Sequence, residues 1–112
     1  MKMRFGQVIA SVVMLVAAPP VLHAQSAAVI NIQTFQFQPK QLEVKAGTPV
    51  TWTNQDDIRH TVTSGAPEKK DGRFDATLAG KGANFTFTFA EPGTYTFFCD
   101  RHQHMRGEIV VK

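Results

Sequence analysis

Residues 97–105 hold more metal-binding side chains than any other part of the 112-residue sequence: Phe97-Phe98-Cys99-Asp100-Arg101-His102-Gln103-His104-Met105. This stretch contains the only cysteine, two of the four histidines and one of the four methionines. Thiolate, imidazole and thioether groups are the donors with which proteins bind soft and intermediate transition metals. We therefore predict a transition-metal site in this stretch.

The spacing of the donors predicts the local shape of the chain. Cys99, His102 and Met105 recur at every third residue. Donors that each approach one ion to about 2.0–2.3 Å, the range known for zinc, cannot lie along an extended strand. The chain must therefore curl after Cys99. Upstream, residues 94–97 alternate threonine with aromatic residues, which predicts a strand that ends at Cys99 with the thiol on the aromatic side.

A fourth donor comes from His60, the one histidine left once the N-terminal segment is set aside. Two histidines, a cysteine and a methionine match the electron-transfer copper site, in which a His2Cys plane has a weak axial methionine. Alternatives stay open at this point. His60 alone is typical of a turn or core histidine, His104 adjoins two donors and would replace either, and Met105 would be a core side chain. We place His104 on the surface, because neighbouring residues of a curled loop seldom point the same way.

Residues 1–24 are predicted to be a secretory signal peptide. The segment carries Lys2 and Arg4, an apolar run over residues 5–18 and a small residue at its end, with cleavage near residues 27–28 as an alternative. The run is shorter than the roughly 20 apolar residues of a membrane span and is interrupted by Gln7 and Ser11, so a retained anchor is the disfavoured alternative. We expect a periplasmic protein without a span, in which a lone cysteine is buried, linked to another chain or bound to a metal.

The mature domain, residues 25–112, is nearly neutral. Removal of Lys2 and Arg4 reduces the twelve basic residues to ten against nine acidic residues, so the formal charge falls from +3 to +1. This balance gives no indication of a nucleic-acid partner.

Alternating apolar and polar residues predict short strands throughout this domain. The predicted strands cover residues 29–37, 42–45, 50–54, 60–63, 85–89, 95–99 and 108–112. Residues 65–82 stay unassigned, with Phe74 and Leu78 as expected anchors to the core. No segment has helical periodicity. The pattern predicts an all-β, two-sheet β-sandwich of seven or eight strands, in which Tyr95 makes a structural corner.

Several segments together resemble the cupredoxin family across the whole mature domain. They are residues 41–47, 50–54, 60–62, 93–99 and 105–107. Two residues separate Cys99 from His102 and two more separate His102 from Met105, a short loop that resembles that of amicyanin. The resemblance implies a Greek-key sandwich and one type 1 copper ion, with His60, Cys99 and His102 in the plane and Met105 axial. It also implies that the His102 ring edge is exposed within an apolar patch.

Two positions depart from the pattern of this family. Gln103 stands where short loops usually carry a proline, and Thr61 stands where an asparagine is frequent after the first histidine ligand. We expect Gln103 to loosen the loop. We expect Thr61 to remove a side chain that ties the two ligand loops together.

The resemblance implies a soluble, monomeric, periplasmic one-electron carrier that shuttles between larger redox proteins, a donor dehydrogenase and an acceptor cytochrome or oxidase. An alternative with the same fold is a protein that binds and delivers copper. An enzyme is not expected, because four protein ligands leave no open coordination position for a substrate. The thioether donor also argues against a zinc hydrolase.

Overall fold

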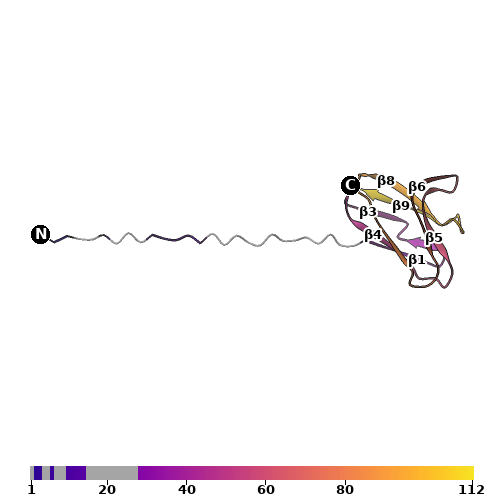
Figure 1. The fold of residues 1–112 in the computed structure, drawn as a ribbon, viewed down its shortest axis with the longest axis horizontal. Helices are drawn as coiled ribbons and strands as arrows, with labels where there is room; N and C mark the ends of the chain where they lie inside the picture. The colour runs from indigo at the N-terminus through magenta and orange to yellow at the C-terminus, as the bar shows by residue number, and fades with distance from the viewer. Residues whose placement is uncertain (1, 4–5, 7–9, 15–27) are drawn as a thin grey trace.

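The computed structural model describes residues 2–3, 6, 10–14 and 28–112 (Figure 1). The predicted signal peptide, residues 1–24, lies mostly outside these described residues. Within the described part of the chain, no helix has the length and apolar character needed to cross a membrane.

The described residues form nine β-strands and no helix, which confirms the all-β prediction. The strands are β1 (Ala28–Gln33), β2 (Gln36–Gln38), β3 (Gln41–Val44), β4 (Pro49–Asn54), β5 (His60–Ala66), β6 (Lys69–Leu78), β7 (Asn84–Thr88), β8 (Gly93–Phe98) and β9 (Arg106–Val111).

Two mixed sheets build the sandwich. One has the strand order β2-β1-β4-β7 and the other the order β3-β9-β8-β5-β6. Most neighbours are antiparallel, but β1 pairs with β4 and β3 pairs with β9 in parallel. Parallel neighbours cannot be joined by a hairpin, so the chain passes repeatedly from one sheet to the other. The predicted two-sheet sandwich is confirmed.

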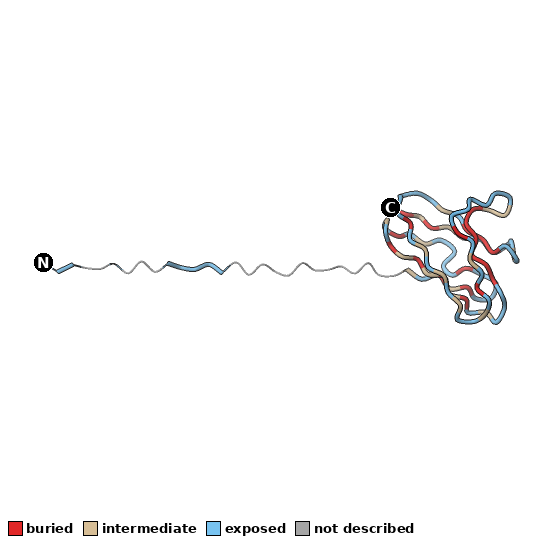
Figure 2. Tube along the Cα trace, viewed as in Figure 1, coloured by how far each residue is buried: buried red, intermediate tan, exposed pale blue. Residues whose placement is uncertain are grey.

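The core lies between the sheets and is rich in aromatic side chains. Buried and exposed positions alternate along most strands, as the tube in Figure 2 shows. Trp52 of β4 is fully buried and meets the ring of Phe97 from β8 edge-on, with 5.3 Å between ring centroids. Phe85 and Phe87 of β7 are half-buried and pack against this core, as their alternation with threonines predicts. A core shared by both sheets fixes how the strand ends of one sheet lie over the other.

The predicted strand over residues 29–37 is in fact two strands, and this part of the prediction is wrong. β1 and β2 form an antiparallel hairpin in which Gln33 pairs with Gln36. The turn is made by Thr34 and Phe35, whose φ angles of 55° and 57° lie in the left-handed region. Neither residue is a glycine or an asparagine, so the local sequence carries no signal for this turn.

The unassigned segment 65–82 contains β6, which pairs with β5 along its length. Phe74 and Leu78 are both buried, as predicted, and join the core. Together with the division of the predicted strand 29–37 into β1 and β2, β6 raises the number of strands above the predicted seven or eight. It forms one edge of the sheet that carries the metal-binding stretch.

A tyrosine corner lies at the start of β8, the strand that leads to Cys99. The hydroxyl group of Tyr95 donates a hydrogen bond of 2.7 Å to the backbone oxygen of Glu91, as predicted. From this corner β8 runs to the opposite end of the domain from the C-terminus. The loop between β8 and β9 projects there, on the right-hand side of Figure 1.

Candidate metal centre

Three predicted donors converge at this end of the sandwich. Nδ1 of His60 lies 3.8 Å from Sγ of Cys99, and Nδ1 of His102 lies 3.7 Å from the same sulfur. The donor atoms of all three residues lie within 4.8 Å of one another. Donors about 2.0–2.3 Å from a shared ion stand about 3.5–4 Å apart, so the two distances to the sulfur have the size that one metal ion requires.

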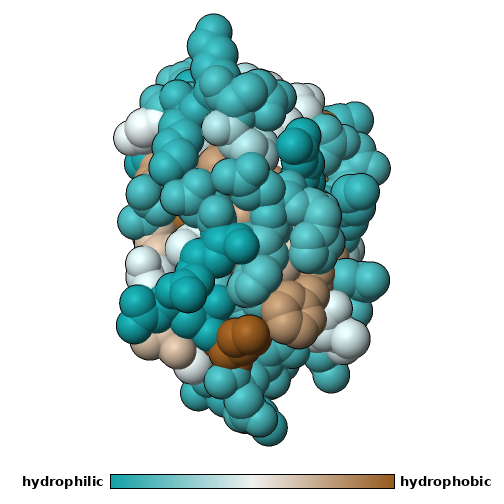
Figure 3. All heavy atoms as spheres, turned by 90° about the vertical axis from the view of Figure 1, so that its right-hand side faces the viewer, coloured by the Kyte–Doolittle hydropathy of each residue, from teal (hydrophilic) through white to brown (hydrophobic). Residues whose placement is uncertain are grey.

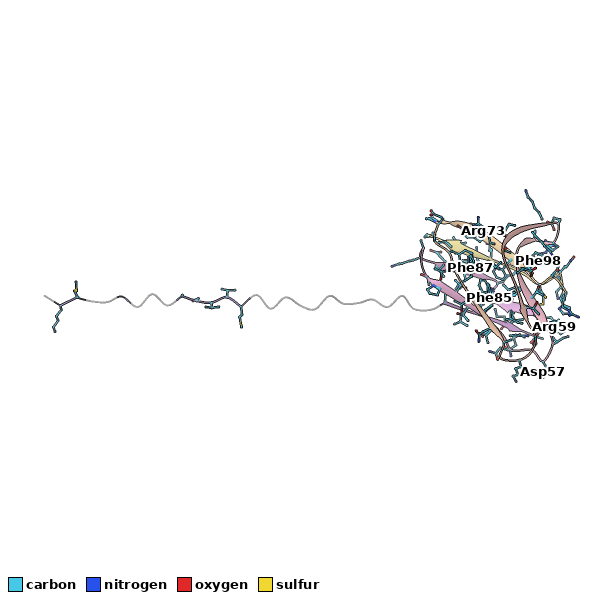
Figure 4. All side chains as sticks on the ribbon, viewed as in Figure 1. Asp57, Arg59, Arg73, Phe85, Phe87 and Phe98 are labelled. Carbon is cyan, nitrogen blue, oxygen red and sulfur yellow. The ribbon has the colours of Figure 1, made fainter. Side chains whose placement is uncertain are left out.

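The sheet positions both the first histidine and the cysteine. His60 opens β5 and Cys99 follows the last residue of β8, and these two strands are neighbours in the same sheet. In Figure 4, Arg59 and Phe98, which precede these two donors, lie on the same side of the domain. Residues far apart in the sequence thus meet because β5 and β8 pair.

The ring of His60 is fully buried, and a carboxylate holds it on the edge that faces away from Cys99. Its Nε2 atom lies 2.8 Å from Oδ2 of Asp56, on the opposite edge of the ring from the sulfur. A carboxylate accepts the proton of Nε2, which leaves the lone pair of Nδ1 free for a metal. The loop that supplies Asp56 is itself ordered by Asn54, whose side chain donates to the backbone oxygen of Ile58 and accepts from the N–H of Asp56.

Thr61 connects the two ligand-bearing segments. Its N–H donates to Sγ of Cys99 at 3.3 Å, and its hydroxyl oxygen accepts the N–H of Asp100 at 2.7 Å. The expectation that Thr61 removes the tie between the two loops is therefore wrong, because the threonine hydroxyl itself makes that tie. An N–H that points at the thiolate also stabilises its negative charge.

The loop after Cys99 closes on itself through its backbone. The N–H of Cys99 donates to the backbone oxygen of Met105 at 3.0 Å, and the N–H of Met105 donates to that of His102 at 2.9 Å. Met105 is buried and belongs to the same core cluster as Cys99. His104 is exposed, as predicted, so the competing histidine lies outside the buried donor group.

His102 differs from His60 in being half-buried on the loop. Burial lowers the pKa of His102, and the proximity of the basic side chains of His60, Arg101 and His104 lowers it further. Its ring is therefore neutral at pH 7 and able to offer a nitrogen lone pair to a metal.

Phe35 was not anticipated as part of the site. Its ring meets the rings of His60 and His102 edge-on, with centroid distances of 5.4 Å and 5.0 Å. The side chain remains 38% exposed and Ile58 is 40% exposed. In Figure 3, a small apolar area interrupts the hydrophilic surface of this end of the domain. Apolar cover beside a half-buried histidine makes that ring reachable from outside while it stays largely shielded from water.

The contact of Asp56 with His60 was not predicted, because an acidic residue four positions before a histidine is common on any polar loop. Burial raises the pKa of the Asp56 carboxyl group. Hydrogen bonds from the N–H groups of Phe35 and Thr34, and from His60, lower this pKa and prevail, so it lies below its ordinary value. Asp56 is thus a carboxylate at neutral pH.

A two-sheet sandwich with buried histidine and cysteine donors at one end defines a class of small metalloproteins. Residues 24–112 match the family of copper binding proteins described as the plastocyanin/azurin family, and the chain belongs to it. The cofactor of this family is copper, and the soft donor set found here fits that metal.

Individual relatives agree with this assignment. The chain is 33% identical over 89 residues to amicyanin from Paracoccus denitrificans, a match that covers 80% of this chain and 68% of the relative. Among solved structures, a purple cupredoxin from Nitrosopumilus maritimus superposes with a TM-score of 0.69 at 30% identity, over 76% of this chain and 99% of the other. Amicyanin from Paracoccus versutus gives a TM-score of 0.69 at 28% identity, over 78% of this chain and 82% of that one. The resemblance to cupredoxins that the sequence motifs indicated is confirmed.

Proposed function

We propose that the protein is a periplasmic one-electron carrier in which His60, Cys99, His102 and Met105 bind a single type 1 copper ion. The observation that carries the proposal is the convergence of one sulfur and two Nδ1 atoms within 4.8 Å of one another. Met105 is buried, and its backbone oxygen accepts the N–H of Cys99 at 3.0 Å, which supports its role as the fourth donor. Bound copper supplies the Cu(II)/Cu(I) couple.

The protein contributes a donor set that is hard to rearrange. Cu(II) and Cu(I) prefer different geometries, so donors that moved with each electron would raise the barrier to transfer. His60 and Cys99 are fixed by paired strands, and backbone hydrogen bonds close the loop that carries His102. Thr61 adds a hydrogen bond to the sulfur, which stabilises its negative charge and so tunes the affinity for each oxidation state.

The burial of the donors favours a carrier over a copper-delivery protein. His60, Cys99 and Met105 are all buried, and the fourth donor, His102, is half-buried. Copper delivery requires that an acceptor protein reaches the metal donors one after another, and the burial of three of the four donors hinders this. Four protein donors also leave no open position for a substrate, which argues against an enzyme.

Electrons would enter and leave through the edge of His102. This residue is the least buried of the four donors and lies against the exposed ring of Phe35. Larger redox proteins would dock on this end of the domain, on the small apolar area around Phe35. A donor dehydrogenase and an acceptor cytochrome or oxidase are the kinds of partner that we expect.

Periplasmic location rests on the predicted signal peptide. The family match begins at residue 24, which supports a boundary between residues 1–24 and a mature domain of residues 25–112. N-terminal sequencing of protein from a periplasmic fraction tests this boundary. A mature N-terminus at Met1 would contradict it.

Copper(II) titration of the purified domain tests the site. We expect an intense visible band from thiolate-to-copper charge transfer and a narrow copper hyperfine splitting, both lost in Cys99→Ser. A wild-type protein that stays colourless would refute the proposal. Incubation of the loaded protein with a copper chelator separates the two candidate functions, because a carrier keeps its copper over many turnovers whereas a delivery protein releases it quickly.

A further inference from the structure

One carboxylate behind the metal centre receives three hydrogen bonds. Oδ2 of Asp56 lies 2.8 Å from Nε2 of His60 and 3.1 Å from the backbone nitrogen of Phe35. Oδ1 of the same group lies 2.8 Å from the backbone nitrogen of Thr34. The side chain is only 16% exposed. A carboxylate with this many donors and so little water is fixed in place.

Two of these bonds hold a turn that is unfavourable by itself. Thr34 and Phe35 have φ angles of 55° and 57°, a left-handed conformation that is unfavourable for residues with a Cβ atom. Successive residues in this conformation turn their N–H groups to one side, where they form a pocket for an anion. Asp56 occupies that pocket, although it lies 22 residues from Thr34 in the sequence.

This turn also places the aromatic ring of Phe35 over the metal centre. Because of the conformation at Phe35, its ring reaches both imidazoles, at 5.4 Å from His60 and 5.0 Å from His102. Asp56 therefore bonds His60 directly and, by holding the turn, also positions the Phe35 ring that covers both histidines.

We propose that Asp56 is a positioning residue of the metal centre, which orients His60 through Nε2 and clamps the turn that holds Phe35 against both histidines. This inference rests on the proposed function only in that His60 is taken as a metal ligand. The carboxylate also places a negative charge behind a ligand, where it favours the more highly charged Cu(II) state over Cu(I). Loss of that charge shifts the redox equilibrium towards Cu(I).

The neighbouring aspartate provides a matched control. Asp57 carries the same charge one residue further along, is exposed, and projects from the lower edge of the domain in Figure 4. Asp56→Asn and Asp57→Asn remove one charge each, but only the first substitution acts on a group bound to His60. Asparagine offers a single carbonyl oxygen, which cannot serve all three donors.

The first measurement uses the metal-free protein and nitrogen-15 NMR of the histidine rings. In the wild type and in Asp57→Asn, we expect His60 to carry its proton on Nε2, with slow exchange of that proton. In Asp56→Asn, we expect faster exchange, together with changed amide shifts at Thr34 and Phe35. Identical ring and amide signals in the two variants would overturn the positioning role.

The second measurement is the reduction potential of the copper-loaded protein. In Asp56→Asn, we expect the redox equilibrium to shift about tenfold towards Cu(I), which is about 59 mV for one electron. In Asp57→Asn, we expect a shift several times smaller, because that charge is exposed to water and screened. A merely structural role of Asp56 would lower stability without this difference in potential. Equal potentials in the two variants would overturn the electrostatic part.

A third variant tests the clamp on the turn. Glycine adopts positive φ at little cost, so Thr34→Gly reduces the need for Asp56 in the metal-free protein. We expect Asp56→Asn to change the unfolding equilibrium constant about two- to fivefold less in the Thr34→Gly background than in the wild type. An equal change in both backgrounds would remove the turn from the proposal.

The role of Asp56 and the copper site itself are tested separately by these measurements. If the wild type binds copper with the thiolate band but Asp56→Asn and Asp57→Asn behave alike, the role of Asp56 is refuted and the proposed function stands. If the wild type shows no such band, the proposed function is refuted, and the NMR and unfolding measurements on metal-free protein still decide whether Asp56 positions His60 and the turn.

Discussion

The two histidines of the metal centre are held in opposite ways. His60 is fully buried, begins a strand that is paired on both sides, and has its far ring nitrogen bound to Asp56. His102 is half-buried on a loop closed by backbone hydrogen bonds, and among the described residues its only polar side-chain neighbour within bonding distance is Cys99. The sheet around His60, here called the wall, holds its donor rigidly. The loop of residues 99–105, here called the rim, is open to partners and to solvent.

The largest expected effect separates these two roles directly. His60→Gly creates a closed cavity in the fixed wall, so we expect loss of the blue copper site that added imidazole does not restore. His102→Gly opens a gap at the rim, through which free imidazole enters and restores the visible band. Copper titration with and without imidazole measures both effects. Equal rescue of the two variants would show that wall and rim do not differ.

Gly107 tests how the rim is anchored to the sheet. A Cβ atom at this position would lie 2.7 Å from the backbone oxygen of Lys40 and press against the ring of Phe97. We expect Gly107→Ala to lower the free energy of unfolding by about 1–3 kcal/mol, a typical cost of overpacking. Denaturant unfolding of the metal-free protein gives this value. Gly72→Ala is not a suitable control because its φ is 77°, whereas Gly80→Ala, which meets open space, is expected to have little effect.

Thr61 joins wall to rim, because its hydroxyl group bonds both the N–H of Asp100 in the loop and the hydroxyl group of Thr63 in β5. Thr61→Val keeps the volume but leaves the N–H of Asp100 without its acceptor. We expect a loss of about 1–2 kcal/mol in unfolding free energy and faster amide exchange in the loop after Cys99. Thr61→Ser, which keeps the hydroxyl, is the matched control. Unchanged exchange in Thr61→Val would mean that the backbone closure of the loop is sufficient.

The smallest expected effect concerns pH. The folded pKa of His102 is lowered, so between that value and the ordinary value of 6.5 the unfolded chain binds more protons than the folded one. The stability of the metal-free protein should therefore fall as pH is lowered through and below about 6.5. Denaturant unfolding at a series of pH values measures this fall, which His102→Asn should reduce. An identical pH dependence in that variant would assign the fall to other groups.

The sequence predicts much of the fold because the relevant signals are local. Alternation of threonine with aromatic residues identifies β7 and β8, and burial of the aromatic side follows from packing two sheets together. The hairpin of β5 and β6 was not predicted, since β6 is mostly polar and exposed and contributes only two large apolar side chains, Phe74 and Leu78, to the core. The backbone hydrogen bonds of β6 to β5 hold the remainder of this strand in place.

The turn at Thr34 and Phe35 shows the limit of local reasoning more sharply. Turn preferences predict glycine or asparagine at such positions, and neither is present. A carboxylate from a distant loop stabilises the turn instead. The same limit explains why Thr61 was misjudged: the geometry between two paired strands, not the residue type, decides whether a hydroxyl reaches a neighbouring N–H.

By itself, the sequence determined the kind of chemistry and the class of fold. Donor atoms and their three-residue spacing depend on residue type and order, and alternation depends on neighbours along the chain. The tertiary structure decided which groups surround the donors: Asp56 behind His60, Phe35 over both imidazoles, and Thr61 between the two ligand segments. Asp56 is only four residues from His60, but the turn that it holds, the ring of Phe35 and the partner of the Thr61 hydroxyl are all distant along the chain from the groups they contact. Only the pairing and packing of the two sheets bring such residues within a few ångströms of one another.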